Sequence, residues 1–279
     1  MLAYRHQFHA GNFADVMKHA LLVQLLLGLA RKDTPFCYVD THAGIGQYDL
    51  EHEWSRKNAE HAQGIARIWH SKDVPESVRP YLDLVAALNE GGQLRHYPGS
   101  PEIARRLLRA GDRMVLSELN TTDHAALRTH MAKARGVSVV HQDGYRTLTS
   151  HLPPPERRGL VLIDSSFDQS EEFARLSNAL AYGHGRFSTG VFALWYPLMD
   201  PAAMRRFERA IRATGVRKIL QMELSVHGES WRESLRGSGL LVVNPPFGFE
   251  AAARSALAWL AAAMAQTAGS FHVRWLVPE

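Results

Sequence analysis

The sequence predicts an α/β protein in which helices pack on a mostly parallel sheet, and three observations support that prediction. Short apolar runs alternate with helical stretches along most of the chain. One of these runs, 36–40, is rich in aromatic and β-branched residues and ends on the carboxylate of Asp40. Gly44 and Gly46 follow it, and glycines at such a turn let the backbone approach a ligand closely. A nucleotide-type ligand site is therefore expected after this strand.

The first expected element is a long helix that precedes the strand. Asn12 is a suitable N-cap, and apolar residues including Val16, Leu21 and Leu25 recur on one face up to about Arg31. The pattern predicts a helix that buries this face against the rest of the protein.

Residues 48–97 interrupt the alternation of strands and helices. This segment begins charged and rich in histidine, and it carries helical patterns at 65–69 and 81–88. We expect residues 48–97 to form a small inserted helical subdomain, and residues 1–47 and 98–279 to form the core.

The remaining apolar runs are expected strands, separated by helical stretches. They are 114–119, 137–142, 160–164, 190–196, 218–224, 240–243 and 271–277. Together with 36–40, these runs predict a Rossmann-like, mostly parallel sheet. The last two runs are expected to form an antiparallel pair around a helix near 250–266.

Composition narrows the function classes. A chain of 279 residues with 46% hydrophobic content can bury one large core. Its single cysteine, Cys37, excludes a disulfide framework and a Cys-rich zinc site, which fits a reducing cytoplasm. No run is expected to reach the ~18 apolar residues of a membrane span, and no export signal is evident. The net charge of +4 is a mild indication of a polyanionic partner, and an ordinary basic enzyme explains it equally well.

The turn after the first strand narrows the ligand. Its D-x-x-x-G-x-G pattern is similar to motif I of the class I S-adenosylmethionine methyltransferases, whose glycines pass under the methionine part of the cofactor. Asp49 stands where a dinucleotide fingerprint needs its third glycine, so NAD is disfavoured. Another α/β binding loop is the alternative, because Gly-rich turns between strands and helices recur in many proteins.

Polar residues at successive strand ends extend the candidate site, because ligands of open α/β sheets bind beyond the carboxyl ends of the strands. Glu118 could accept hydrogen bonds from a ribose diol, or it could cap a helix. Asp143 could accept a hydrogen bond from an adenine amino group, and Gly144, which has no side chain, would leave room for the adenine ring. Alternatively, the two residues could form an ordinary Asp-Gly turn. Asp164 ends the next strand. The order of these features along the chain favours a cofactor site.

The tetrapeptide 164–167, Asp-Ser-Ser-Phe, stands where amino methyltransferases carry a D-P-P-Y-like sequence. Adenine delocalises the lone pair of its amino nitrogen, so methyl transfer needs acceptors for the amino hydrogens and an aromatic surface for the flipped base. Asp164 and the backbone carbonyl of residue 165 would supply the acceptors, and Phe167 the surface. A second tetrapeptide, 244–247 (Asn-Pro-Pro-Phe), follows a later strand, and we interpret it as a strand-ending turn.

Five short segments identify the family that the chain resembles. They are YRHQFHAGNFADVMKH at 4–19, DTHAG at 40–44, YPGSP at 97–101, LWYP at 194–197 and WLVPE at 275–279. Over essentially its whole length, the chain resembles the RlmJ family of 23S ribosomal RNA adenine-N6 methyltransferases. This resemblance implies a class I methyltransferase fold with a mostly parallel sheet of seven strands. That family usually has D-P-P-Y at 164–167, so Ser165 and Ser166 depart from its pattern.

The resemblance implies roles for particular residues. Asp164 would be catalytic, and Tyr4 would contact RNA. We place His6 and Phe167 on the RNA side as well. The cofactor contacts that the resemblance implies are Lys18, His19, His42, Ser100, Glu118, Asp143, Gly144 and Asp164.

Local interpretations of these residues leave alternatives open. Lys18 and His19 lie on one helix, where long polar side chains usually reach solvent. Ser100 precedes a proline, as a helix N-cap often does, and a cap can also contact a ligand. No metal is expected, because the histidines near the N-terminus and the glycine turn lack the spacing of metal ligands.

Two surfaces are candidates for RNA binding. Arg205, Arg209 and Arg212 share one helix face, which could track phosphates or could simply be solvated. The segment 48–97 could contact RNA around the flipped base.

These observations predict a cytoplasmic, monomeric methyltransferase that uses S-adenosylmethionine to modify adenine N6 in large-subunit ribosomal RNA, without a membrane partner. The alternative is an RNA- and cofactor-binding module whose catalysis is impaired because Ser165 and Ser166 replace the usual prolines. A nicotinamide-dependent oxidoreductase is a third class, which the missing glycine disfavours.

Overall fold

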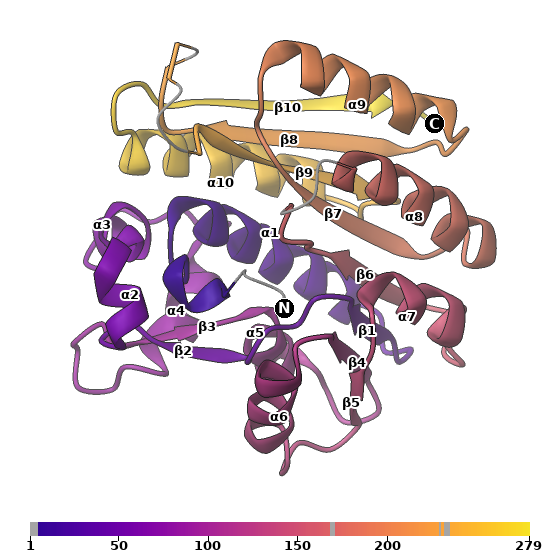
Figure 1. The fold of residues 1–279 in the computed structure, drawn as a ribbon, viewed down its shortest axis with the longest axis horizontal. Helices are drawn as coiled ribbons and strands as arrows, with labels where there is room; N and C mark the ends of the chain where they lie inside the picture. The colour runs from indigo at the N-terminus through magenta and orange to yellow at the C-terminus, as the bar shows by residue number, and fades with distance from the viewer. Residues whose placement is uncertain (1–4, 168–170, 229, 232–234) are drawn as a thin grey trace.

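The computed structural model describes residues 5–167, 171–228, 230–231 and 235–279, and helices lie on both sides of a central sheet (Figure 1). The sheet has eight strands in the order β10-β8-β9-β7-β6-β1-β4-β5, one more than the seven predicted. The strand bounds are β1 Cys37–Asp40, β4 Arg113–Glu118, β5 Val137–His141, β6 Gly159–Ile163, β7 Val191–Pro197, β8 Ile219–Ser225, β9 Gly237–Val243 and β10 Ser270–Val277.

The sheet has a parallel half and an antiparallel half. Strands β5, β4, β1, β6 and β7 run parallel, whereas β7, β9, β8 and β10 pair antiparallel. Because β9 runs against β7, the end of β9 lies beside the start of β7, where Val243 pairs with Phe192. The predicted pairing of the last two strands is wrong. The helix between them carries the chain past β8, so β10 joins β8 at the edge and β9 lies between β7 and β8.

Helices cover the two faces of the sheet, and side chains alternate between the two cores that result. The helices outside the insertion are α1 Phe13–Ala30, α5 Ser100–Leu107, α6 Thr121–His130, α7 Gly144–His151, α8 Glu172–Arg186, α9 Pro201–Ala213 and α10 Phe249–Met264. On β1, Tyr38 packs into the core that contains α1 and α10, whereas Cys37 and Val39 pack into the core that contains α7, α8 and α9. This is the two-residue period of a strand buried on both faces.

Helix α1 packs against α5 and α10 in the middle of the fold. Its predicted cap is confirmed, because the Asn12 side chain accepts a hydrogen bond from the Asp15 N–H. Contrary to the expectation from sequence, α1 is long and apolar enough to cross a membrane by length and composition, with a mean hydropathy of 1.5. However, 78% of it is buried inside the protein, so its apolar character is that of a core helix.

The segment 48–97 lies almost entirely between two short strands, β2 and β3, which pair antiparallel. Its elements are β2 Gln47–Asp49, α2 Glu53–Asn58, a 3₁₀ helix Glu60–Gln63, α3 Ile65–Ile68, α4 Arg79–Ala86 and β3 His96–Pro98, and another 3₁₀ helix, His6–Phe8, precedes α1. The helical patterns predicted at 65–69 and 81–88 correspond to α3 and α4. The division into a core and an inserted subdomain stays a prediction.

Candidate active site

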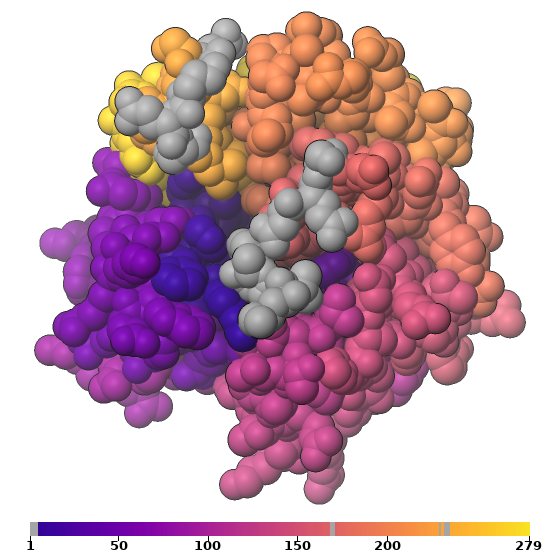
Figure 2. Space-filling model, in the orientation of Figure 1, coloured from indigo at the N-terminus to yellow at the C-terminus, as the bar shows by residue number. Residues whose placement is uncertain are grey.

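A cavity of about 1220 Å³ lies beyond the carboxyl ends of the parallel strands. Its walls come from α1, the insertion and the turns that follow β1, β4, β5 and β6. In the space-filling view of this face, the indigo N-terminal segment is recessed between the purple insertion and the orange C-terminal part of the chain (Figure 2). The carboxyl ends of the strands are the usual place for a ligand in an open α/β sheet.

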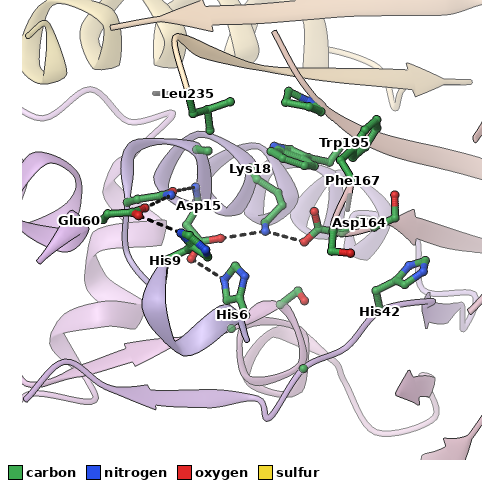
Figure 3. Close-up of a pocket in the computed structure, with 18 of the residues that line it drawn as sticks. His6, His9, Asp15, Lys18, His42, Glu60, Asp164, Phe167, Trp195 and Leu235 are labelled. Carbon is green, nitrogen blue, oxygen red and sulfur yellow. Dashed lines mark hydrogen bonds and ion pairs between the residues drawn. The ribbon is translucent and has the colours of Figure 1, made fainter. Parts of the chain in front are cut away.

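Lys18 connects two carboxylates in the middle of the cavity (Figure 3). Its Nζ donates to Asp164 Oδ2 at 2.5 Å and to Asp15 Oδ1 at 2.8 Å. Burial alone would lower the pKa of Lys18, but the two carboxylates raise this pKa above its usual value. The ammonium group therefore stays charged and fixes the position of Asp164. The alternative of a solvent-facing Lys18 is wrong, because its side chain is only 5% exposed.

Asp15 supports Lys18 from the first turn of α1. Its Oδ2 lies 2.9 Å from His6 Nε2 and accepts from the Gly11 N–H at 3.0 Å. Burial would raise the pKa of the Asp15 carboxyl, but His6 and Lys18 lower this pKa well below its usual value. An ionised Asp15 thus holds both a lysine and a histidine at the cavity wall.

His19 is buried beside this network rather than exposed on the helix surface. Its side chain contacts the Tyr97 hydroxyl, with 2.9 Å between Nδ1 and the oxygen. Burial lowers the pKa of His19 to about 3, so its imidazole is neutral at pH 7. The solvent-facing alternative is wrong here too, because His19 is only 1% exposed.

Protein packing explains the glycine at the turn after β1. Gly44 has a φ of +62°, and a Cβ there would lie 2.3 Å from the Tyr48 hydroxyl. Its N–H donates to Glu118 Oε2 at 2.9 Å. Glycine is therefore required by the left-handed backbone and by Tyr48, whereas the sequence argument attributed it to a ligand.

Ser100 is not the N-cap that the sequence suggested, because Gly99 caps α5 and Ser100 is the first residue of that helix. Its Oγ donates to Asp40 Oδ2 at 2.7 Å, and the Tyr38 hydroxyl donates to the same oxygen at 2.7 Å. Burial raises the pKa of Asp40 to about 6, although these hydrogen bonds act against it. Ser100 lines the cavity and tethers the end of β1.

Glu118 and Asp143 line the cavity and also hold the backbone around it. Glu118 Oε1 accepts from the Asn120 N–H at 2.7 Å, and Asp143 Oδ1 accepts from the Tyr145 N–H at 2.9 Å as the N-cap of α7. The capping alternative for Glu118 is wrong, because Asn120 is the N-cap of α6. Asp143 begins a helix as its N-cap instead of forming only an ordinary turn. These hydrogen bonds leave carboxylate lone pairs of both residues for a ligand.

His42 and Gly144 meet where the turns after β1 and β5 touch. A Cβ on Gly144 would lie 2.1 Å from the Thr41 carbonyl oxygen and 2.8 Å from His42 Cε1. Gly144 thus makes room for the chain at 41–42. Burial lowers the pKa of His42, and its Nδ1 lies 2.8 Å from Thr41 Oγ1.

Aromatic side chains surround the end of the tetrapeptide 164–167. The Phe167 ring lies edge-on to Phe173 at 4.8 Å and to Trp195 at 5.6 Å between centroids. Phe167 has a φ of +55°, and Lys18 Nζ lies 6.0 Å from the Trp195 ring. The cavity therefore has an aromatic wall next to Asp164.

The second tetrapeptide, 244–247, lies at the opposite end of the strands, beside their amino ends, because β9 runs antiparallel to β7. Asn244 Nδ2 donates to the carbonyls of Ser188 and Gly190, both at 2.9 Å, and Phe247 is 95% exposed. It is a strand-ending turn, as predicted. The arginines of α9 are exposed outside the cavity, and their contact with RNA stays a prediction.

The cavity brings together most of the residues that the sequence selected. These are His6, Lys18, His19, His42, Ser100, Glu118, Asp143, Gly144, Asp164 and Phe167. Tyr4 lies outside the described residues, and among those described no group of three or more His, Cys, Asp or Glu could hold a metal.

Asp15, Glu60 and Trp195 are among the cavity residues that were given no role from the sequence. Asp15 follows Asn12 in the first turn of α1, so the helical period could have placed it beside Lys18. Only the folded chain brings Glu60 of the insertion to the same wall.

Comparisons with known proteins agree with this geometry. The family described as "Ribosomal RNA large subunit methyltransferase D, RlmJ" matches residues 33–277. The chain is 43% identical to "Ribosomal RNA large subunit methyltransferase J" of Escherichia coli and 40% identical to the Haemophilus influenzae protein of the same name. Both alignments cover 100% of this chain and 100% of the relative.

Solved structures extend the comparison to the fold. Protein LPL1258 of Legionella pneumophila is similar with a TM-score of 0.90 and 35% identity, covering 96% of this chain and 98% of that one. A probable spermidine synthase of Corynebacterium glutamicum has a TM-score of 0.50 and 10% identity, covering 94% and 82%. The second likeness concerns the fold alone.

Proposed function

Because the chain belongs to the RlmJ family of large-subunit ribosomal RNA methyltransferases, we propose that it transfers a methyl group from S-adenosylmethionine to N6 of one adenine in 23S ribosomal RNA. The observation that carries this proposal is the Asp164–Lys18 pair, which stands next to an aromatic wall in a cavity at the ends of the parallel strands. We also propose that the protein works in the cytoplasm as a monomer.

The residues around the cavity fit the cofactor by their chemistry. Glu118 and Asp143 are carboxylates at neighbouring strand ends, suited to a ribose diol and an adenine amino group. We assign the remaining contacts to Lys18, His19, His42, Ser100, Gly144 and Asp164. When bound, S-adenosylmethionine supplies a methyl group that is activated by a sulfonium.

Asp164 is assigned the role of acceptor for the reacting amine. Lys18 bonds its Oδ2, which leaves Oδ1 to accept a hydrogen of the adenine amino group. The backbone carbonyl of residue 165 takes the second hydrogen. The nitrogen can then become pyramidal and present its lone pair to the methyl carbon. As the new N–C bond forms, the bond between that carbon and the sulfonium sulfur would break, and the proton that the nitrogen loses would pass to Asp164 and on to solvent. Phe167 covers a face of the flipped base.

Ser165 and Ser166 do not remove these functions. The second acceptor is a backbone carbonyl, and any residue at position 165 supplies one. Asp164 and an aromatic residue at 167 flank the change. A binding module without turnover is therefore the less favoured alternative.

The test is methyl transfer to 23S ribosomal RNA that lacks the modification, followed by mass spectrometry of the nucleosides. We expect N6-methyladenine at one position. Cofactor binding by calorimetry without any methyl incorporation would instead support the binding module.

A further inference from the structure

The cavity extends beyond Lys18, away from His42 and Asp164, to an end marked by His9 and Glu60 (Figure 3). Asn58 and Gln63 of the insertion also line the cavity, and we call these four residues the Glu60 compartment. The whole cavity, about 1220 Å³, exceeds the roughly 300–1,000 Å³ of a single-ligand pocket. Neither the cofactor nor the reacting adenine has been assigned to these four side chains.

The chemistry of the compartment suits a base better than a phosphate. It offers a carboxylate, two amides and an imidazole. Among the described residues that line the whole cavity, the only lysine or arginine side chains are Lys18 and Arg175, which bond carboxylates nearer the cofactor side. Phosphates are bound mainly by cations, and a carboxylate repels them. Carboxylate and amide groups instead match the N–H groups and ring acceptors at the edge of a base.

Glu60 is held in place before any ligand arrives. Its Oε1 lies 2.9 Å from His9 Nδ1, and its Oε2 accepts from Asn12 Nδ2 at 3.0 Å. Partial burial would raise the pKa of the Glu60 carboxyl, but these hydrogen bonds lower this pKa below its usual value. A carboxylate has about four lone-pair sites. The two close bonds and a longer one from Asn58 Nδ2 to Oε1, at 3.5 Å, occupy three of them and leave about one for a ligand. The side chain is 33% exposed, so it can still accept from a ligand.

Helix α1 sets the spacing between the compartment and Asp164. Asn12 bonds Glu60 and Lys18 bonds Asp164, and the step of six positions from residue 12 to residue 18 rises roughly 9 Å along a helix. Stacked nucleotides advance only about 3.4 Å each. Two neighbouring bases that occupied these two places would therefore be unstacked, with the strand between them extended, as it is around a flipped base.

We propose that the Glu60 compartment is a second base subsite: it binds the base next to the reacting adenine on the RNA strand, and Glu60 accepts a hydrogen bond from an N–H of that base. This inference rests on the proposed function, since it assumes that the substrate is RNA with a flipped adenine.

The experiment uses an RNA fragment that the full-length enzyme methylates. Each neighbour of the target adenine is replaced in turn by an abasic nucleotide, and then by unsubstituted purine, which stacks but has no exocyclic or imino donor. We expect both changes at one of the two neighbours to lower kcat/KM about 10- to 100-fold, the range for a hydrogen bond to a charged group. The Glu60→Ala variant should methylate the parent RNA more slowly by a similar factor and should not respond to either change.

Glu53→Ala is the matched control, because Glu53 is an exposed glutamate on α2 of the same insertion. It should respond to the RNA changes as the natural enzyme does. Calorimetry with S-adenosylmethionine should show equal affinity in Glu60→Ala and the natural enzyme, which verifies that the variant is folded.

Two results would overturn the subsite. One is an abasic neighbour without effect on either side. The other is Glu60→Ala slowing all RNAs by one common factor, which would mean that Glu60 only holds Asn12. If the natural enzyme methylates no RNA, the proposed function fails instead, and the same comparison made by RNA-binding affinity tests the subsite separately.

Discussion

The two tetrapeptides of this chain look alike in sequence, yet they lie at opposite ends of the strands of one sheet. Residues 164–167 end a parallel strand, and Asp164 there is bonded to buried Lys18 in the cavity. Residues 244–247 end β9, and Asn244 there bonds two backbone carbonyls while Phe247 points into solvent. The second segment has the prolines that the family motif leads one to expect, whereas the first lies in the cavity. Strand direction, more than the match to a motif, decides which segment reaches the cavity.

The largest expected effect separates the two tetrapeptides directly. Asp164→Asn should lower single-turnover methylation about 10²- to 10⁴-fold, because the amine loses a positioned proton acceptor. Asn244→Ala should leave turnover unchanged and lower the free energy of unfolding by about 1–3 kcal/mol, since two backbone carbonyls lose their donor. Rapid-quench assays measure the methylation rate, and urea unfolding measures the free energy of unfolding. Loss of turnover in Asn244→Ala would reverse the comparison.

The next effect concerns cofactor affinity and Glu118, which lies at the carboxyl end of a parallel strand. Glu118→Ala should weaken S-adenosylmethionine binding by roughly 1.5–3 kcal/mol, the scale of a hydrogen bond to a charged group. Glu223→Ala is the control, because Glu223 lies on β8 in the antiparallel half, where it accepts from the Tyr196 hydroxyl. Titration calorimetry measures both affinities. Equal affinity in Glu118→Ala and the natural chain would limit Glu118 to its contacts with the backbone.

A further effect concerns the response of the protein's stability to acid, which should depend on His19 of α1. Burial lowers the pKa of His19 to about 3, so the unfolded chain binds a proton that the folded chain excludes between about pH 6.5 and 3. Stability should therefore fall as pH falls through this window, by about 1.4 kcal/mol per unit from this group. Asp40, whose pKa is raised to about 6, acts in the opposite direction below pH 6, so variants are compared at equal pH.

His19→Gln should flatten this pH dependence, and His272→Gln on exposed β10 should not. Denaturant unfolding at several pH values gives the slopes. Identical slopes in the two variants would mean that His19 becomes protonated without cost.

The smallest effect comes from exchanging the central residues of the two tetrapeptides. Placing proline at 165 and 166 should preserve or modestly raise turnover, because it lowers the ordering cost of the turn by about 0.4–1 kcal/mol per compatible site. The reverse change, Pro245 and Pro246 to serine, should lower stability by a similar amount and leave turnover unchanged. Thermal unfolding and methylation assays record both. A natural chain that is inactive until the prolines are restored would favour the binding module.

Much of the fold could be predicted because strand ends and helix caps are local signals. Asn12 capped α1 as expected, and the apolar runs marked every strand of the sheet. The order of the last strands could not be predicted, because periodicity says that a run is a strand and does not say which neighbour it joins. Hence the expected pairing of 240–243 with 271–277 was wrong.

The same limit applies to the site. The position of Asp164, Glu118 and Asp143 at the cavity could be predicted, because each lies at the carboxyl end of a strand of the parallel half. The surroundings of Lys18 could not be predicted, since its buried side chain pairs with Asp164, which is 146 residues away in the chain. Glu60 gave no signal for the same reason, because its partners His9 and Asn12 belong to the N-terminal segment.

The apolar character of helix α1 affects the synthesis of the protein on the ribosome. α1 is among the first segments made, and α10, which packs against it, is among the last. At about 5–20 residues per second, roughly 10–45 s pass between the two. During that time an unusually apolar helix lacks its partner, so the nascent chain should need shielding by a chaperone. Chains stopped before residue 249 should bind a dye for apolar surface, and the completed protein should not.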